Sequence, residues 1–159
     1  MKRKITFFLL TITLFGFVSC TNSTYFEKEV VFTKKGWNRF RPEEFQFEIK
    51  NADKRYNINL EVKLNDSFQH LSLPMYYSID DNSGAENRTG RFSIRIKDLE
   101  EKFMNPADKN GIYTFEQNFQ PNKKFNAAGT YKYTLEHGTS NYDLEGVVSI
   151  RFFVTLAKK

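Results

Sequence analysis

The chain of 159 residues carries 24 Lys and Arg against 19 Asp and Glu, and it contains one cysteine and two histidines. A single cysteine excludes an internal disulfide and a zinc site built from several cysteines. The formal net charge is +5, but no dense basic stripe marks a nucleic-acid-binding surface. Aromatic residues make up 16% of the chain. This content suits a β protein, because aromatic side chains pack well on half-buried sheets.

The N-terminus has the organisation of a bacterial lipoprotein signal. Met1–Lys4 is basic, Ile5–Val18 is apolar, and a small residue precedes the lone Cys20. The apolar run is shorter than the about 20 residues that a membrane-spanning helix needs. We therefore predict a signal peptide over residues 1–19 and acylation of the Cys20 thiol with palmitate-like chains. An ordinary secretory signal is the alternative, since Phe17 stands where lipoprotein motifs usually carry Leu.

Cleavage before Cys20 would remove three basic residues and lower the net charge from +5 to +2. The mature chain would begin with a polar, lipidated tether over residues 20–24. Residues 25–159 are predicted to form a single domain, because no linker-like stretch divides them and no internal repeat is visible. A domain of this length can bury a sizeable core.

Apolar and polar residues alternate over most of the domain, which is the pattern of strands with one buried face. The alternating runs cover residues 25–33, 44–49, 56–64, 71–79, 92–96, 113–115, 131–135 and 148–156. Asn, Asp and Gly residues typical of turns separate many of these runs. Each run places one apolar row inward and one polar row outward, as in antiparallel sheets that cover one core.

These runs predict an all-β fold, an antiparallel β-sandwich of jelly-roll type with about 7–9 strands. A closed barrel is the alternative. The one short helix is predicted over Asp98–Asn105, with Asp98 as its cap and Pro106 after its end. Pro74 cannot donate to a sheet ladder, so the strand over residues 71–79 is expected at a sheet edge or with a bulge. An exposed edge either docks another chain or needs protection from aggregation.

The sequence offers little for catalysis. His70 and His137 fall near strand ends, where polar side chains stay solvated, and neither belongs to a metal-binding motif. No G-x-S-x-G sequence occurs, and lipidation would consume the only thiol. The glutamates of the clearest strands lie on outward faces and need not converge; they are Glu44, Glu48 and Glu61. We expect a protein that is not an enzyme and that requires no cofactor.

No metal site is expected either. Asp80–Glu86 has oxygen ligands around a glycine, as in part of a calcium-binding loop, but the downstream glutamate is missing because position 91 is Arg. The same residue types form ordinary turns, which is the interpretation we favour.

Three residues are candidates for contact with a partner. Trp37, the only tryptophan, lies between the first two strands and either fills one end of the core or contacts a sugar or a protein. Pro74 marks the strand predicted at an edge, and Tyr76 follows it on the outward face.

The mature chain resembles the gliding-motility lipoprotein H (GldH-like) family. The resemblance rests on the order of segments along the chain: Trp37, Glu44–Ile49, Tyr56–Leu60, Leu71–Met75, Phe125, Gly129–Tyr133, Glu136–His137 and Leu144–Val148. Residues 98–119 depart most from the family pattern. The resemblance implies an outer-membrane-anchored, non-enzymatic accessory protein of gliding and type IX secretion machinery, which binds other envelope lipoproteins or outer-membrane proteins.

The lipidated cysteine is followed by no acidic residue before Glu27, which in such bacteria favours a periplasm-facing domain over a surface-exposed one. The alternative function is a carbohydrate-binding or carbohydrate-degrading envelope lipoprotein. A row of exposed rings on one flat face, such as Trp37 with Tyr76 or Tyr142, would favour that alternative.

Overall fold

The structure is a computed structural model that describes residues 24–81 and 87–158. The predicted signal peptide, Cys20 and most of the tether lie outside these residues, as does most of the Asp80–Glu86 turn. The described residues form ten strands and no helix: β1 (Thr24–Val31), β2 (Trp37–Asn38), β3 (Glu43–Ile49), β4 (Arg55–Leu64), β5 (Ser72–Asp81), β6 (Asn87–Arg95), β7 (Tyr113–Lys124), β8 (Gly129–His137), β9 (Asp143–Leu144) and β10 (Val147–Leu156).

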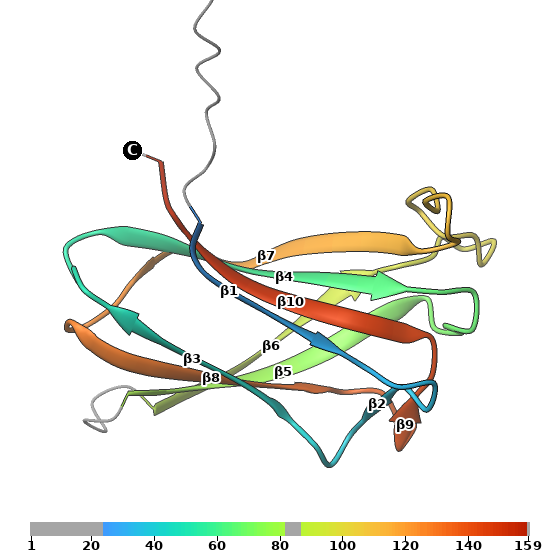
Figure 1. Ribbon diagram of the computed structural model, residues 1–159, viewed down its shortest axis with the longest axis horizontal. Coiled ribbons are helices and arrows are strands. Elements are labelled where there is room, and N and C mark those ends of the chain that lie inside the picture. The colour runs from blue at the N-terminus through green and yellow to red at the C-terminus, as the bar shows by residue number, and fades with distance from the viewer. Residues whose placement is uncertain (1–23, 82–86, 159) are drawn as a thin grey trace, which may run out of the picture.

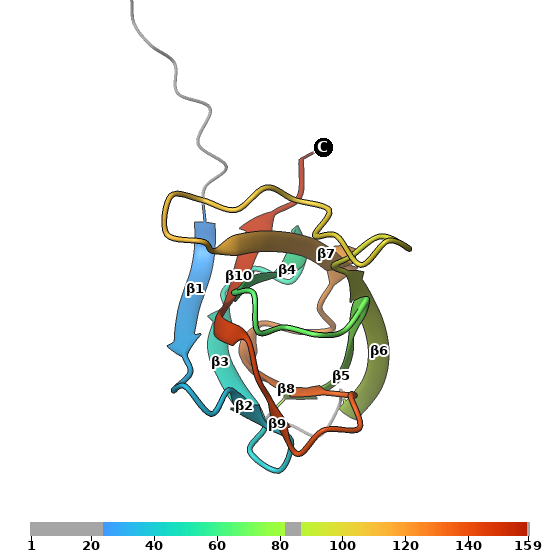
Figure 2. The same cartoon turned by 90° about the vertical axis from the view of Figure 1, so that its right-hand side faces the viewer.

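Two four-stranded antiparallel sheets lie face to face (Figures 1 and 2). The first sheet has the order β1-β10-β4-β7 and the second sheet the order β3-β8-β5-β6. Successive long strands alternate between the sheets, except for β5 and β6, which are hydrogen-bonded neighbours in the second sheet. This winding is that of a jelly roll, so the predicted antiparallel sandwich is confirmed. The ten strands exceed the predicted number because β2 and β9 have two residues each, too few to show alternation.

Aromatic side chains from both sheets form the core. Phe45 of β3 stacks on Phe152 of β10 with ring centroids 4.8 Å apart, and Tyr133 of β8 lies 5.3 Å from the same ring. These residues are the inward row of the alternation along each strand. The buried phenylalanine and tyrosine rings therefore hold the two sheets together without any disulfide.

The predicted helix over Asp98–Asn105 is wrong, because this segment forms a tight turn. The Asp98 carboxylate accepts hydrogen bonds from the backbone N–H groups of Glu100 and Lys102, both at 2.9 Å, and Glu101 adopts a left-handed φ of 62°. An aspartate that can cap a helix can equally support such a turn. The same turn recurs at Asp108, which accepts from Asn110 and Ile112 and has Gly111 at the left-handed position, a repeat that the sequence alone did not reveal.

The predicted edge position of the Pro74 strand is also wrong. β5 pairs with β6 on one side and with β8 on the other, without a register shift. Pro74 is tolerated in this central strand because of where its missing N–H would point. Its carbonyl accepts a hydrogen bond from Gly138 N–H at 2.8 Å, and Gly138 follows the last residue of β8. The absent N–H of Pro74 therefore removes only one hydrogen bond, at the end of the β5–β8 ladder.

Candidate functional site

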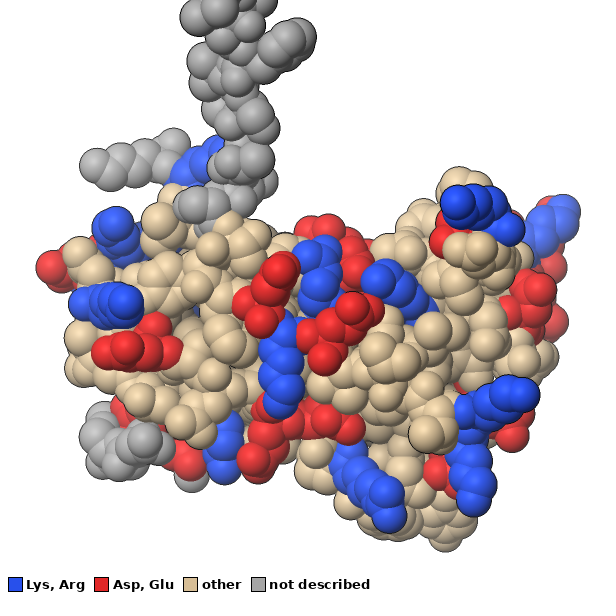
Figure 3. Space-filling model, in the orientation of Figure 1, with Lys and Arg blue, Asp and Glu red and all other residues tan. Residues whose placement is uncertain are grey.

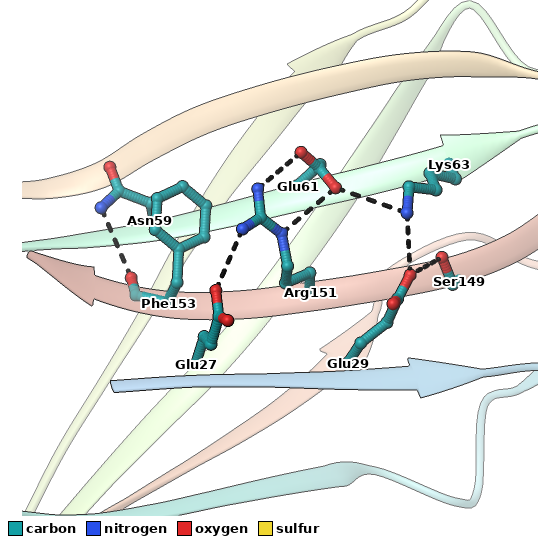
Figure 4. Close-up of polar contacts among 8 residues, drawn as sticks. All are labelled: Glu27, Glu29, Asn59, Glu61, Lys63, Ser149, Arg151 and Phe153. Carbon is teal, nitrogen blue, oxygen red and sulfur yellow. Dashed lines mark hydrogen bonds and ion pairs between the residues drawn. The ribbon is translucent and has the colours of Figure 1, made fainter. Parts of the chain in front are cut away.

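Paired charges cover the outer face of the first sheet. Figure 3 shows acidic and basic side chains alternating at the centre of this face, and Figure 4 shows the contacts among them. Arg151 of β10 contacts Glu61 of β4 at 2.8 Å and Glu27 of β1 at 3.2 Å. Lys63 lies 3.0 Å from Glu29 and 3.8 Å from Glu61. These contacts join three neighbouring strands into one ion-pair network.

The network favours the charged form of its members. A hydrogen bond from the Ser149 hydroxyl at 2.7 Å, together with the Lys63 ammonium, lowers the pKa of Glu29 below its ordinary value. The hydrogen bonds to Glu61 raise the pKa of the Arg151 guanidinium. The Arg151 guanidinium also lies over the Phe153 ring, 4.6 Å from its centroid. The charges of this network, on Glu27, Glu29, Glu61, Lys63 and Arg151, are therefore satisfied within the domain and offer little to a partner.

The outer face of the second sheet is different, because it contains a groove of about 460 Å³. We call it the Tyr76 groove, and it is lined by Pro42, Tyr76, Tyr77, Ser78, Thr89, Gly90, Arg91, Thr134 and Glu136. Three strands contribute to its floor. Across the strands, Tyr76 of β5 pairs with Arg91 of β6 on one side and with Glu136 of β8 on the other.

Gly138 leaves room for the Tyr76 ring at the end of β8. A Cβ atom at Gly138 would lie 2.6 Å from Cε2 of Tyr76, so only glycine lets the ring approach the end of β8 this closely. The Tyr76 side chain nevertheless stays 42% exposed. Within residues 24–81 and 87–158, neither Arg91 nor Glu136 forms an ion pair or a side-chain hydrogen bond. The groove thus combines an exposed ring with two available charges of opposite sign.

The structure removes Trp37 from the surface candidates. Its side chain is 1% exposed, stacks on Phe32 at 5.3 Å, and donates from Nε1 to the Arg41 carbonyl at 3.2 Å. Of the two interpretations that the sequence left open, the structure has the tryptophan filling one end of the core. Pro74 lies next to Tyr76 on the outer face of the second sheet and is half-buried.

His137 is buried beside Trp37, contrary to the expectation of a solvated strand end. Its Nε2 lies 3.1 Å from the Trp37 carbonyl oxygen, and its Nδ1 lies 2.8 Å from the Thr139 hydroxyl. Burial is the main cause that lowers the pKa of His137, so the neutral imidazole is favoured. The His137 ring therefore joins β2 to the end of β8 through the Trp37 carbonyl. Both of its ring nitrogens have hydrogen-bond partners, so neither is free for catalysis.

Several surface residues could not be selected from the sequence. Arg91 and Glu136 are 45 positions apart and become neighbours of Tyr76 only through strand pairing. Phe40 and Tyr142 form a second exposed aromatic pair near β2 and β9, with ring centroids 5.5 Å apart and exposures of 71% and 68%. Only the alternation that put Tyr76 on an outward face signalled any of these positions.

The described residues contain no group of three or more His, Cys, Asp or Glu side chains placed to hold a metal ion. A helix long and apolar enough to cross a membrane is likewise not found in residues 24–81 and 87–158. The glutamates predicted to face outward do so, with Glu44 and Glu48 exposed on β3 and Glu61 engaged by Arg151.

The fold and these surfaces define a jelly-roll β-sandwich domain with an ion-pair network at the centre of one outer face and a groove on the other. The profile of the GldH lipoprotein family matches residues 24–152, and the chain belongs to this family. The resemblance inferred from the order of sequence segments is therefore confirmed. Membership of a lipoprotein family implies lipid-anchored association with a membrane.

None of the curated proteins matches this chain significantly. Among solved structures, the chain is similar to a carbohydrate-binding module specific for non-crystalline cellulose, with 12% sequence identity and a TM-score of 0.42. The similarity covers 84% of this chain and 75% of that module.

Proposed function

We propose that this protein is a membrane-anchored, non-enzymatic accessory component of an envelope machinery for gliding motility or type IX secretion. In this proposal the domain binds another envelope protein through the Tyr76 groove. The observation that carries the proposal is the exposed Tyr76 ring between Arg91 and Glu136, two charges without partners among the described residues. Family membership supports the envelope context.

The composition of the groove suits a protein partner. Tyr and Arg are the residue types that most often dominate binding energy at protein interfaces. Both are present here next to a carboxylate, so a partner can form a charge pair with either side of the ring. The centre of the first sheet lacks these features, because the charges of its network are already paired with one another.

The position of the N-terminus supports an orientation at the membrane. Thr24 pairs with Thr155 near the C-terminal end, so both chain ends leave the same end of the domain. Thr24 is four positions after Cys20, which gives the tether a reach of about 14 Å. Exposed basic residues gather at this end and suit anionic lipid headgroups: Lys54, Arg55, Lys124 and Lys158. We propose that the domain faces the periplasm from the outer membrane and meets membrane-proximal partners.

We favour this function over carbohydrate binding because of one specific observation. The carbohydrate alternative would be supported by a row of exposed rings on one flat face, such as Trp37 with Tyr76 or Tyr142. Trp37 is buried in the core, and Tyr142 pairs with Phe40 near the β2–β9 end rather than with Tyr76.

The test is purification of the lipidated protein from native membranes, with identification of the proteins that accompany it. The wild type should capture a defined envelope protein, and Tyr76→Ala should lose it. The control is Glu116→Ala, which changes an exposed position on the outer face of the first sheet, opposite Glu61. Equal capture by both variants and the wild type would place the partner site elsewhere. Turnover of a glycan or ester by the purified protein would contradict the non-enzymatic role.

A further inference from the structure

The outermost strands of the two sheets are β1, β7, β3 and β6, and three of them are protected. Side chains of β1 reach carbonyls of β3: Lys28 Nζ donates to Glu44 and the Tyr25 hydroxyl donates to Glu48, both at 2.9 Å. β7 contains Pro121, and its pairing with β4 has two register shifts. Such devices blunt a sheet edge against further pairing.

β6 has none of these protections among the described residues. It runs for nine residues without proline, and its pairing with β5 shows no register shift. Within residues 24–81 and 87–158, no backbone hydrogen bond is formed along the edge of β6 that faces away from β5. In Figure 2, β6 forms the side of the sandwich opposite β1. A regular edge of this length is a template for an additional strand.

The register identifies the backbone groups that face this edge. Gly138 N–H donates to the Pro74 carbonyl, so the backbone of Pro74 points towards β8 and away from β6. Pro74 pairs with Ser93, which therefore directs its own N–H and carbonyl groups to the free side of β6. Arg91 and Arg95 lie two residues before and after Ser93. Their backbone N–H and carbonyl groups also face the free side of β6, because these groups alternate in direction along a strand.

These same residues place their side chains on the outer face of the second sheet, beside Tyr76. β6 has three arginines and no carboxylate: Arg88, Arg91 and Arg95. No ion pair satisfies any of them within the described residues. A strand added to this edge would place its outward side chains directly opposite Arg91, Ser93 and Arg95.

We propose that β6 accepts an extended acidic segment of the partner protein as a fifth strand of the second sheet. Two carboxylates four residues apart on one face of that segment would pair with Arg91 and Arg95. Main-chain hydrogen bonds to Ser93 would supply affinity independent of side-chain type. A second copy of β6 fits poorly, because its arginines would face arginines. The inference rests on the proposed function and specifies how the partner is bound.

The experiment uses a fluorescent nonapeptide with glutamate at positions 3 and 7, threonine at positions 1, 5 and 9, and valine elsewhere. Fluorescence anisotropy with the lipidated protein in detergent should give saturable binding. Combined replacement Arg91→Glu and Arg95→Glu should weaken binding at least about tenfold, since two attractive cross-strand pairs become repulsive. A peptide with lysine in place of both glutamates should not bind.

The Ser93 pair of variants tests strand addition itself. Ser93→Pro removes only an N–H that faces the free edge and should abolish binding, whereas Ser93→Ala keeps the N–H and should bind like the wild type. Circular dichroism shows whether each variant is folded. If Ser93→Pro does not fold, the binding of the arginine variants tests the proposal in its place.

Absence of saturable binding, or equal binding by both Ser93 variants, overturns the proposal. So does a wild-type dimer in sedimentation that Ser93→Pro dissociates. Tyr76-dependent capture of a native partner would then leave the proposed function intact.

Discussion

The two outer faces of the sandwich carry similar residue types, and the charges at the centre of the first sheet are paired differently from those around Tyr76 on the second sheet. On the first sheet, Arg151 is placed between Glu27 and Glu61, and each of these three charges has a partner on a neighbouring strand. On the second sheet, Arg91 and Glu136 are separated by Tyr76 and make no ion pair among the described residues. On the first sheet the residue between the two carboxylates is an arginine, which pairs with both of them. On the second sheet the residue between Arg91 and Glu136 is Tyr76, whose ring carries no charge.

This contrast separates stability from binding. Removing one member of a partly buried ion pair leaves the other charge without compensation, which lowers the free energy of unfolding. A charge that stays solvated contributes little to folding and is available for complementarity across an interface. We therefore expect substitutions on the first face to change the free energy of unfolding, and those on the second face to change binding.

The largest expected effect on stability is that of Arg151→Ala. It leaves the Glu61 carboxylate, whose side chain is 13% exposed, without its closest cation, and it also frees Glu27. We expect a loss of about 2 kcal/mol in the free energy of unfolding, measured by urea denaturation. The matched control Arg91→Ala should stay within about 0.5 kcal/mol of the wild type. Equal losses for both variants would contradict the contrast between the faces.

Ser149→Ala should have an intermediate effect that depends on pH. The Ser149 hydroxyl helps lower the pKa of Glu29, so its stabilising contribution is present above the pKa of Glu29 in the unfolded chain. At neutral pH we expect a loss of about 1 kcal/mol. The difference from the wild type should vanish as the pH falls through the lowered pKa of folded Glu29, because the carboxyl is then protonated. Urea denaturation between pH 7 and pH 3 measures this.

A difference between Ser149→Ala and the wild type that is constant over this pH range would assign the effect to packing. A difference that grows towards acid pH would have the wrong sign for a carboxylate of lowered pKa.

The smallest effect on stability is expected for Gly138→Ala. The methyl group of the new alanine would displace the exposed Tyr76 ring, which can move into solvent. The free energy of unfolding should therefore change by less than about 0.5 kcal/mol. Capture of the native partner should nevertheless fall, since the ring loses its position between Arg91 and Glu136. A variant that keeps full capture would show that the position of the ring is not used in binding.

The sequence predicts the sandwich well because alternation is a local property of each strand. Strand β10 was expected over residues 148–156 and is observed over Val147–Leu156. The predictions that are wrong concern segments whose structure depends on contacts with residues outside the segment. Asp98 supports a turn rather than a helix because Lys97 pairs with Phe103, and Pro74 is tolerated in a central strand because β8 ends beside it.

The candidate site was predictable only in part, for the same reason. The outward position of Tyr76 follows from alternation, whereas its charged neighbours come from strands β6 and β8 and depend on sheet order. The burial of Trp37 with His137 joins residues 100 positions apart in the chain. No local pattern encodes such a contact, so the sequence left both interpretations of Trp37 open.

The central claim is that the partner contacts the second sheet and not the first. A photo-crosslinking amino acid introduced in living cells at position 76, and separately at position 116 of β7, tests it most directly. Both positions are exposed, and they lie on the outer faces of opposite sheets. We predict a discrete crosslinked adduct to an envelope protein from position 76 and none from position 116. An adduct from position 116, or from neither position, would contradict the account.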